Sequence, residues 1–289
     1  MKQNKVVSTL VFALCIMISL IVLLPLFLMI LTSLKSTGEI NAEAFVFIPK
    51  KLLFSNYVDA MRKGNWFIYF KNTVIVTAIT VIISLIINSL AGYAFARIPF
   101  KGRDILFFIA MIGMMIPGQV TMIPVFTQLK TFPLAGGNNI FGAGGTGLIN
   151  TYAGLILPYI AGAFGVFLCR QYYMGIPQAL DEAAKIDGCS RMKAYIYIFL
   201  PNSKSILATL AVLKASQTWN DYIWPLIMIS NDSKRTVQVA LVNTFVTEVS
   251  TNWNLLMAGT TIVMLPLVIL FLFTQKYFVE GVVSSGIKG

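Results

Sequence analysis

The stretch DEAAKIDGCSRMKAYIYIFLP, residues Asp181–Pro201, separates two long apolar runs in a chain that otherwise contains few charges. It is too polar to cross a membrane. Pro177 suits the first turn of a helix and Gly188 suits a left-handed helix end, so we expect a helix over 177–188. At 1.5 Å per residue this helix is about 16 Å long, too short to span a bilayer.

A second short helix is expected after the glycine. Ser190 can accept a hydrogen bond at its N-terminus, and Pro201 marks its end. Lys193 stands where a capping box needs Glu or Gln, so only the serine half of that motif is present. In the first helix, Asp181 and Lys185 have the favourable i,i+4 order. The segment therefore predicts two short helices joined by a glycine corner.

The composition is that of a membrane protein. Hydrophobic residues make up 57% of the 289 residues and charged residues 11%, with a mean hydropathy of +0.79, whereas soluble domains carry about 25% charged residues. The net charge of +11 fits Lys and Arg in loops beside anionic lipid, so no nucleic-acid partner is expected. The absence of histidine and the scattering of the three cysteines argue against His-based catalysis and a metal site.

Six apolar runs are long enough to cross a hydrocarbon core as helices, which takes about 20 residues. The first run is too long for the apolar part of a secretory leader and no cleavage site follows it, so we expect it to be retained. The fold class is therefore an all-α polytopic membrane protein with a single transmembrane domain over 1–289. The expected spans cover residues 7–34, 72–96, 105–126, 152–173, 205–229 and 254–274.

Loop charges predict the orientation. The short loop RIPFKGRD at 97–104 carries three basic residues, whereas the glycine-rich loop 127–150 carries only Lys130. Because basic residues in short loops favour the cytoplasmic side, both termini are expected in the cytoplasm. The long loop 35–71 then lies outside, and its aromatic end NWFIYFKNTV is expected at the membrane interface before the second span.

One motif in the outer loop 127–150 is misleading. GAGGTG, residues Gly142–Gly147, matches the G-x-G-x-x-G pattern of dinucleotide-binding sites. That fingerprint needs a strand before it, a helix after it and an acidic residue about 20 positions later. The preceding FPLAGGNNIF is typical of turns, and the residues around Phe167 are an apolar span. We expect a flexible loop, and since no G-x-x-x-x-G-K-[ST] pattern occurs, any ATP must bind another chain.

The residue order of the opening stretch resembles the EAA loop of binding-protein-dependent ABC importer permeases. Glu182-Ala183-Ala184, three residues, Gly188, nine residues, Ile198, one residue and Leu200-Pro201 match that loop at every anchor position. IDG at 186–188 is similar to the carbohydrate branch. TWNDYIWPL at 218–226 and the C-terminal QKYFVEGVVSSGIKG are similar to the maltose-type second permease subunit. NYVDAM, the NT at Asn72 and GYAFARIPFKGR fit as well, so the resemblance covers nearly the whole chain.

This resemblance implies a type I ABC importer permease fold and a role in ATP-driven import of a sugar, an oligosaccharide in particular. The partners would be a second permease subunit in a heterodimer, two ATP-binding subunits, an extracytoplasmic sugar-binding protein and membrane lipid. The chain itself would be no enzyme and would bind no metal or cofactor, since ATP and Mg²⁺ belong to the partner subunits. Its location would be the bacterial cytoplasmic membrane.

The resemblance also assigns parts of the chain. Residues 72–275 would form the core permease bundle, preceded by span 7–34 and outer loop 35–71. Residues 177–201 would form the cytoplasmic coupling loop, whose helix sits in a cleft of an ATP-binding subunit, and 276–289 a cytoplasmic tail. The expected coupling residues are Glu182, Ala183, Ala184, Asp187, Gly188, Leu200 and Pro201, and the tail residues expected to contact an ATP-binding subunit are Gly286, Ile287 and Lys288.

The fifth expected span carries a stripe of polar residues, namely Lys214, Gln217, Thr218, Asn220 and Asp221. A charge at mid-membrane costs about 2.5–3.5 kcal/mol on insertion scales, so the stripe should face the bundle or a wet cavity. Two interpretations stay open. The stripe lines the substrate path or the contact with the second permease, or Lys214 and Asp221, about 10 Å apart along the axis, each pair with a neighbouring helix.

Two further features leave alternatives open. Trp219, Tyr222 and Trp224 either stack on sugar rings or form the outer aromatic belt, and in maltose-type importers the second permease can hold most sugar contacts. MMIPGQVTMIP, Met114–Pro124, interrupts the third span with two prolines and a glycine, which gives either a broken helix along a transport path or a simple kink.

Two other classes of function fit the sequence less well than an importer subunit does. A stand-alone secondary transporter of a small polar solute usually contains two related halves, and the sequence has no convincing halves. An intramembrane enzyme needs an acid and a base paired in a pocket, and the spans hold few carboxylates and no histidine.

Overall fold

The computed structural model describes residues 5–247 and 250–286. Three helices are long and apolar enough to cross a membrane, and three bent helix pairs bring the number of possible spans to six. This agrees with the six spans expected from the sequence. The chain divides into two compact units, Met1–Trp66 with Ala240–Leu265, and Phe67–Val239 with Pro266–Gly289, which are described separately.

The first unit begins with an apolar helix whose side chains are exposed along most of its length, as in a helix that faces lipid. After this helix the Asn56 side chain donates to the backbone oxygens of Ser33 (2.8 Å) and Lys35 (2.9 Å). These bonds hold the turn between the span and the loop that follows. The helices here are α1 (Lys5–Ser33), α2 (Thr37–Ile40) and α3 (Ser55–Arg62).

The rest of this unit comes from near the C-terminus, where α13 (Val237–Phe245) is followed by α14 (Trp253–Gly286). The Trp66 ring stacks on Phe245 with centroids 6.0 Å apart, and its indole N–H donates to Ala60 O at 3.0 Å. Gly259 lets the two helices approach closely, since an added Cβ would lie 2.9 Å from Leu241 Cδ1.

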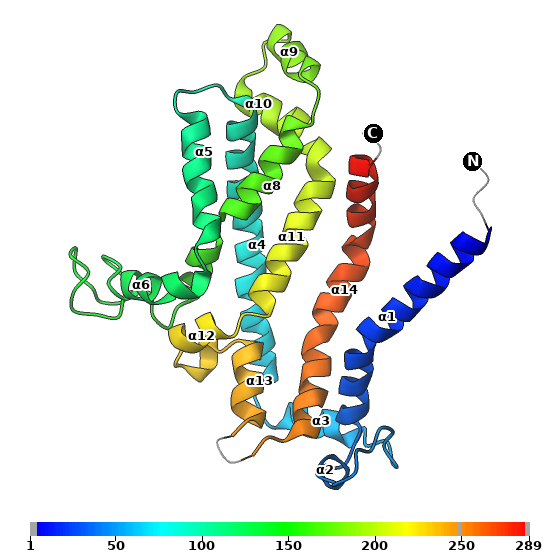
Figure 1. The fold of residues 1–289 in the computed structure, drawn as a ribbon. Coiled ribbons are helices and arrows are strands. Elements are labelled where there is room, and N and C mark those ends of the chain that lie inside the picture. Colours follow the sequence, from blue (N-terminus) through cyan, green and yellow to red (C-terminus); the bar gives the residue numbers. More distant parts are fainter. Residues whose placement is uncertain (1–4, 248–249, 287–289) are drawn as a thin grey trace. The chain divides into compact units, whose positions relative to one another are not determined.

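The second unit is a helical bundle in which α4, α5, α8 and α11 run along its length (Figure 1). Its α-helices are α4 (Trp66–Arg97), α5 (Arg103–Ile112), α6 (Gly118–Lys130), α7 (Tyr152–Ile156), α8 (Ala163–Met174), α9 (Ala179–Ile186), α10 (Arg191–Ala194), α11 (Lys204–Trp219) and α12 (Ile223–Met228). Shorter turns lie at Gly113–Met115, Leu157–Tyr159, Pro201–Ser203 and Asp232–Lys234, and a π-helical turn lies at Tyr195–Phe199. The aromatic segment expected at the interface before span two forms the first turns of α4 itself.

The third expected span is broken. The segment formed by α5 and the turn Gly113–Met115 meets α6 at an angle of 103° (Figure 1). Ile116 is extended and Pro117 starts α6 without an N–H to continue the preceding helix. MMIPGQVTMIP therefore breaks the helix and does not merely kink it, while its place along a transport path stays a prediction.

The fourth and fifth spans each bend by 45°. The fifth differs from the expected 205–229, because α11 ends at Trp219 and a separate short helix, α12, begins at Ile223. The side chain of Asp221 accepts the backbone N–H of Trp224 at 3.4 Å, which favours a new helix start. At its other end the span runs back through Pro201 to Arg191.

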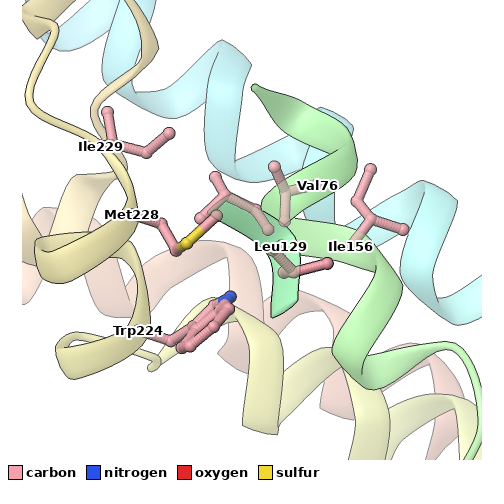
Figure 2. Packing of buried hydrophobic residues seen from close by; sticks show 7 residues of the cluster. Val76, Leu129, Ile156, Trp224, Met228 and Ile229 are labelled. Atoms are coloured by element: carbon pink, nitrogen blue, oxygen red, sulfur yellow. The ribbon is translucent and has the colours of Figure 1, made fainter. Parts of the chain in front are cut away.

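The core near the α12 end of this bundle is apolar. Figure 2 shows side chains from α4, α6, α7 and α12 that converge on one cluster, with Trp224 and Met228 from α12 beside Leu129. Trp224 is buried and donates its indole N–H to Gly154 O at 3.1 Å. This cluster fixes α12 against the bundle after the break in the fifth span.

The loop that contains GAGGTG folds back on the end of α6. Leu148 N–H donates to Leu129 O at 2.8 Å, and the Asn138 side chain donates to Lys130 O at 2.9 Å. Gly147 has φ +57°, and an added Cβ would overlap the Leu129 and Lys130 carbonyl oxygens. No strand precedes this motif in the described residues. The glycines serve a tight loop that is hydrogen-bonded to the end of α6, whereas a flexible one was expected from the sequence.

Contacts at the two ends of the bundle join the same segments that six successive spans would place on one side of a membrane. At one end Arg97, the last residue of α4, reaches Asp181 in the first turn of α9 at 2.8 Å. At the other end the Asn72 side chain donates to Arg235 O at 2.9 Å and accepts from the Tyr152 hydroxyl at 2.6 Å. Loops expected on one side of the membrane therefore meet each other.

Candidate functional site

The helix expected over 177–188 is present but shorter. It is α9, which spans Ala179–Ile186 and projects beyond the ends of α4, α5 and α8 (Figure 1). Pro177 precedes the helix instead of occupying its first turn, and its carbonyl accepts the Leu180 N–H at 3.3 Å. Asp181 and Glu182 lie in the first turn, where the helix dipole favours negative charge.

Gly188 ends α9 as the sequence predicted. Its φ is +68°, its N–H donates to Lys185 O at 3.1 Å, and the Cys189 N–H donates to Ala184 O at 2.8 Å. This pair of bonds is a Schellman motif, which satisfies carbonyls that the helix end would leave unpaired. Ser190 then accepts the Lys193 N–H at 3.3 Å and starts α10, which confirms its predicted role.

The predicted coupling residues of α9 differ in how exposed they are. Ala184 is only 4% exposed and faces the bundle, whereas Ile186 is 86% exposed at the tip of the helix. The adjacent alanines therefore do not form a common outward surface, because neighbouring helix positions differ by about 100°. The residues that face outward are Glu182, Ala183, Lys185, Ile186, Asp187 and Gly188; we call them the α9 surface.

Leu200 and Pro201 are not part of the α9 surface. The Leu200 N–H donates to Tyr195 O at 2.8 Å and closes the π-helical turn, and its side chain packs beside a buried cluster that includes Phe199. Pro201 begins the turn that leads into α11. Both residues therefore belong to the joint between the coupling loop and the fifth span.

The tail prediction falls partly outside the described residues. Gly286 is the last residue of α14, and Ile287 and Lys288 lie outside the part of the chain that the structure describes.

Arg97 connects several segments of this region, although the sequence identified it only as a basic residue at a loop. Arg97 Nη1 lies 2.8 Å from Asp181 Oδ2, so the carboxylate that was expected to pair with Lys185 within α9 pairs with another helix. The two residues are 84 positions apart. The sequence showed only that one is a basic residue at the end of a span and the other an acidic residue in the coupling loop, which does not predict that they pair.

A cavity of about 950 Å³ lies beside the broken third span. Its walls come from the turn before α6 and from α6 itself, from the bend between α7 and α8, and from the C-terminal end of α11. The cavity therefore lies where three spans are interrupted, and at such interruptions some backbone N–H and C=O groups lack helical hydrogen-bond partners.

Four of the five stripe residues line this cavity: Lys214, Gln217, Asn220 and Asp221. Thr218 does not line it and is buried. On a helix Gln217 and Thr218 lie on opposite sides of Lys214, by about 60° and about 40°, so a single stripe cannot point all of them into one space. Thr218 faces the side of the bundle where Thr73 and Val76 lie.

The two charges of the stripe differ in their partners. Asp221 Oδ2 accepts a hydrogen bond from the Tyr159 hydroxyl at 2.7 Å, so this carboxylate is paired with a neighbouring span. Lys214 Nζ contacts Gln217 Oε1 at 3.3 Å on its own helix and faces the cavity. Asp221 therefore pairs with a neighbouring helix, whereas Lys214 faces the cavity, and its place on the substrate path or at the contact with the second permease stays a prediction.

The aromatic residues near Asp221 are mostly structural. Trp219 is 5% exposed and packs against Phe70, and Trp224 is 3% exposed in the cluster of Figure 2. Trp224 also lines the cavity, so the two interpretations from the sequence, sugar stacking and an aromatic belt, both stay predictions. Tyr222 lines the cavity.

Comparison with known proteins identifies the family. The model of the family described as binding-protein-dependent transport system inner membrane component matches residues 88–284. That range contains α9, the broken third span and the cavity. The chain belongs to this family.

Relatives of this permease match along nearly its whole length. It is 34% identical over 275 residues to the arabinooligosaccharides transport system permease protein AraQ of Halalkalibacterium halodurans, covering 94% of this chain and 93% of AraQ. It is 33% identical over 290 residues to the probable starch degradation products transport system permease protein AmyC of Thermoanaerobacterium thermosulfurigenes, covering 100% of both.

A solved structure shares the fold. The permease resembles a chain from the crystal structure of a bacterial ABC transporter that imports the acidic polysaccharide alginate, with a TM-score of 0.78 and 23% identity, covering 96% of this chain and 98% of that one. At this identity the likeness is one of fold. The type I ABC importer permease fold expected from the sequence is confirmed.

Family membership settles two questions that the residues left open. The chain is a multi-pass membrane subunit of an ABC importer and not a stand-alone secondary transporter. As the permease component it has no ATPase site, since ATP is hydrolysed by other subunits of such systems.

Proposed function

We propose that this permease imports an oligosaccharide across a bacterial cytoplasmic membrane, as one half of a heterodimer with a second permease. Two ATP-binding subunits, which hold ATP and Mg²⁺, attach on the cytoplasmic side, and a sugar-binding protein delivers the substrate from outside. The names of the relatives support a carbohydrate substrate, because AraQ transports arabinooligosaccharides and AmyC is assigned to starch degradation products.

The observation that carries this proposal is the α9 surface. Ile186 is 86% exposed at the tip of α9, and Ala183 beside it adds no bulk to this face. An exposed apolar side chain among Glu182, Lys185 and Asp187 suits a docking site with an apolar centre and a polar rim. A cleft in an ATP-binding subunit would receive this helix end, and closure of two such subunits on ATP would move it.

The cavity is proposed as this permease's share of the substrate path. Lys214, Gln217 and Asn220 offer donors and acceptors from α11, and Tyr222 offers an aromatic ring. Uncharged hydroxyl-rich molecules are recognised by such a mixture of polar groups and ring faces. The second permease would complete the walls and can hold the larger part of the sugar contacts.

The orientation and the domain assignments remain part of the proposal. Loop 97–104 and the α9 loop would both face the cytoplasm, together with both termini, which fits the basic residues of the first loop. The tail residues Gly286, Ile287 and Lys288 would contact an ATP-binding subunit. Residues 72–275 would form the core permease bundle, with 177–201 as its coupling loop.

Co-purification tests this function. The tagged chain is expressed with its partner permease, ATP-binding subunit and binding protein, and the complex is reconstituted in lipid nanodiscs. We expect a complex with two ATP-binding subunits whose ATPase activity rises when the binding protein carries a neutral oligosaccharide, with arabinotriose, maltotriose and raffinose as the first probes. A chain that purifies alone and transports solute on an ion gradient without ATP would contradict the proposal.

A further inference from the structure

Arg97 is the last residue of α4, and its side chain is only 6% exposed. A guanidinium carries five N–H donors in a rigid planar fork, so its burial requires several acceptors around it. The structure supplies them from segments that are far from Arg97 in the sequence. These acceptors define what the residue holds together.

Two of the acceptors are at the end of α8. Arg97 Nε donates to Tyr173 O at 3.0 Å, and Nη2 donates to Tyr173 O and to Ile176 O. These carbonyls belong to the last turn of α8 and the residues just after it, where helix carbonyls lack intrahelical partners. A cation at a helix C-terminus is also favoured by the helix dipole. Arg97 therefore caps α8 from another span.

The third acceptor is in α9. Arg97 Nη1 donates to Asp181 Oδ2 at 2.8 Å, and Asp181 lies in the first turn of α9. The same guanidinium thus contacts the C-terminal end of α8 and the N-terminal turn of α9. The short connection between these helices, residues 175–178, is held at both of its ends by one side chain.

The face of the guanidinium contacts a fourth segment. Its Cζ lies 5.2 Å from the centroid of the Phe199 ring, which belongs to the π-helical turn before the fifth span. Phe199 is fully buried and packs against Tyr93 of α4 and Tyr173 of α8, at centroid distances of 5.0 and 5.9 Å. Arg97 therefore touches the spans on both sides of α9.

We propose that Arg97 is a positioning residue that makes α9 move as one body with spans two, four and five. This inference depends on the proposed function, since it assumes that an ATP-binding subunit pushes on the α9 surface. Displacement of α9 would pull directly on the Arg97–Asp181 bond and, through the connection 175–178, on the Arg97 bonds to the Tyr173 and Ile176 carbonyls, so the spans must follow. Without the guanidinium, α9 remains joined to the bundle by chain connections and by the packing of Ala184, and it can tilt independently.

The proposal distinguishes the guanidinium from its charge. A lysine at position 97 keeps the positive charge, but all its N–H donors are on one nitrogen atom. It therefore cannot donate to Asp181 and to the Tyr173 and Ile176 carbonyls at the same time. Asp181 is the α9 partner of the fork, and an asparagine at this position keeps an oxygen that can accept the Nη1–H bond. Loss of the Asp181 charge should therefore matter less than loss of the fork.

The test uses the whole importer in lipid nanodiscs, with the binding protein loaded with arabinotriose or maltotriose, whichever stimulates the unmodified complex. The measured quantity is the ratio of stimulated to basal ATPase activity in complexes that contain all subunits. We expect Arg97→Gln to lower this ratio at least tenfold, Arg97→Lys to lower it severalfold, and Asp181→Asn to lower it less than twofold. A role in folding alone would change the yield of complex and leave the ratio unchanged.

Arg170 provides the matched control. It is a half-buried arginine near the same ends of the spans. Its Cζ lies 4.1 Å from the Phe107 centroid, its Nη2 3.6 Å from Asp104 Oδ1 and its Nε 3.4 Å from Phe95 O, so these contacts are to α5 and α4 and not to α9. We expect Arg170→Gln to keep the ratio within twofold of the unmodified complex. An equal loss in this variant would overturn the proposal, because the effect would then reflect inner-end packing in general.

The remaining outcomes are also decisive. Assembled Arg97→Gln or Arg97→Lys complexes that keep the unmodified ratio would show that α9 is coupled without the fork, and failure of both variants to assemble would assign Arg97 to folding. Either result overturns the inference while leaving the proposed function intact. An unmodified complex that shows no stimulation by any loaded binding protein would instead contradict the proposed function.

Discussion

The hydroxyl of Tyr159 lies 2.7 Å from Asp221 Oδ2 and donates a hydrogen bond to it across two spans. This contact joins the bend between α7 and α8 to the break between α11 and α12. It leaves Lys214 as the charged side chain that faces the cavity without a carboxylate partner in the described residues. The wall of the proposed path therefore contains two charged side chains: Asp221, which is hydrogen-bonded to Tyr159, and Lys214, which has no carboxylate partner in the described residues.

Removal of the anchor should destabilise the protein. In Tyr159→Phe, Asp221 keeps only the longer bond from Trp224 N–H at 3.4 Å. Hydrogen bonds to charged groups contribute about 1.5–3 kcal/mol, so the unfolding free energy should fall by roughly that amount. The thermal midpoint of the purified complex measures the change. Tyr222→Phe is the control, because the Tyr222 hydroxyl lines the same cavity and makes no hydrogen bond among the described residues; equal midpoints in the two variants would contradict this account.

Removal of the available charge should change transport and not stability. Lys214→Gln shortens the side chain and removes a charged donor from the cavity wall, so KM for uptake should rise about tenfold if Lys214 contacts the substrate. Lys204→Gln is the matched control, since Lys204 starts the same helix, is exposed and does not line the cavity. Uptake kinetics in proteoliposomes separate the two. An unchanged KM in Lys214→Gln would remove this residue from the proposed path.

Different substitutions of Gly188 should reduce transport to different degrees. An added Cβ meets nothing within 4 Å, so the cost of substitution comes from φ +68° alone. Gly188→Ala should cost about 1–2 kcal/mol locally, and Gly188→Asn less, because Asn adopts this conformation more readily. Gly188→Pro also loses the N–H bond to Lys185 and should abolish coupling.

Uptake rates are therefore expected to fall in the order Gly, Asn, Ala, Pro at position 188. Gly38→Ala serves as the control, because Gly38 also has open space around it but has no positive φ. Normal uptake in Gly188→Pro would refute the role of this corner.

The loop after α1 predicts a pH dependence. Backbone N–H groups of Ser36 and Lys50 donate to Glu39 at 2.9 and 2.7 Å, and these bonds lower the pKa of Glu39 below its ordinary value. Because the pKa is lowered in the folded state, the stabilisation is present above the ordinary pKa and is lost as the pH falls through the lowered value. The protection of residues 36–50 against hydrogen exchange, taken relative to the intrinsic exchange rate at each pH, should therefore fall as the pH drops below about 4.

Two substitutions check the assignment of this pH dependence. Glu39→Gln should remove it, since the amide does not titrate, whereas Glu43→Gln in the same loop should keep it. Protection that falls equally in both variants would assign the effect to another group.

The parts of the fold predicted from the sequence are those that depend on neighbouring residues. Apolar length set the six spans, Pro117 set the break in the third, and Gly188 set the end of α9 because only a few residues tolerate its φ. The ends of helices were less certain. The sequence placed the end of span five near 229, but the Asp221 bond to Trp224 N–H ends α11 ten residues earlier.

The parts missed depend on partners far away in the chain. Arg97 and Asp181 are separated by 84 positions, and Tyr159 and Asp221 by 62. Nothing in a single sequence marks such pairs. The burial of Trp219 and Trp224 was missed for the same reason, because an aromatic residue next to polar ones has the same pattern whether it faces lipid, sugar or the core.

The central claim is that the α9 surface docks on an ATP-binding subunit, and site-directed crosslinking in membranes tests it most directly. In a chain with Cys15, Cys169 and Cys189 replaced by serine, Ile186→Cys should crosslink to the ATP-binding subunit, and Phe141→Cys, 84% exposed in the loop after α6, should not. Equal labelling of both cysteines by a membrane-impermeant thiol reagent from outside, or no crosslink from Ile186→Cys in an assembled complex, would contradict the account.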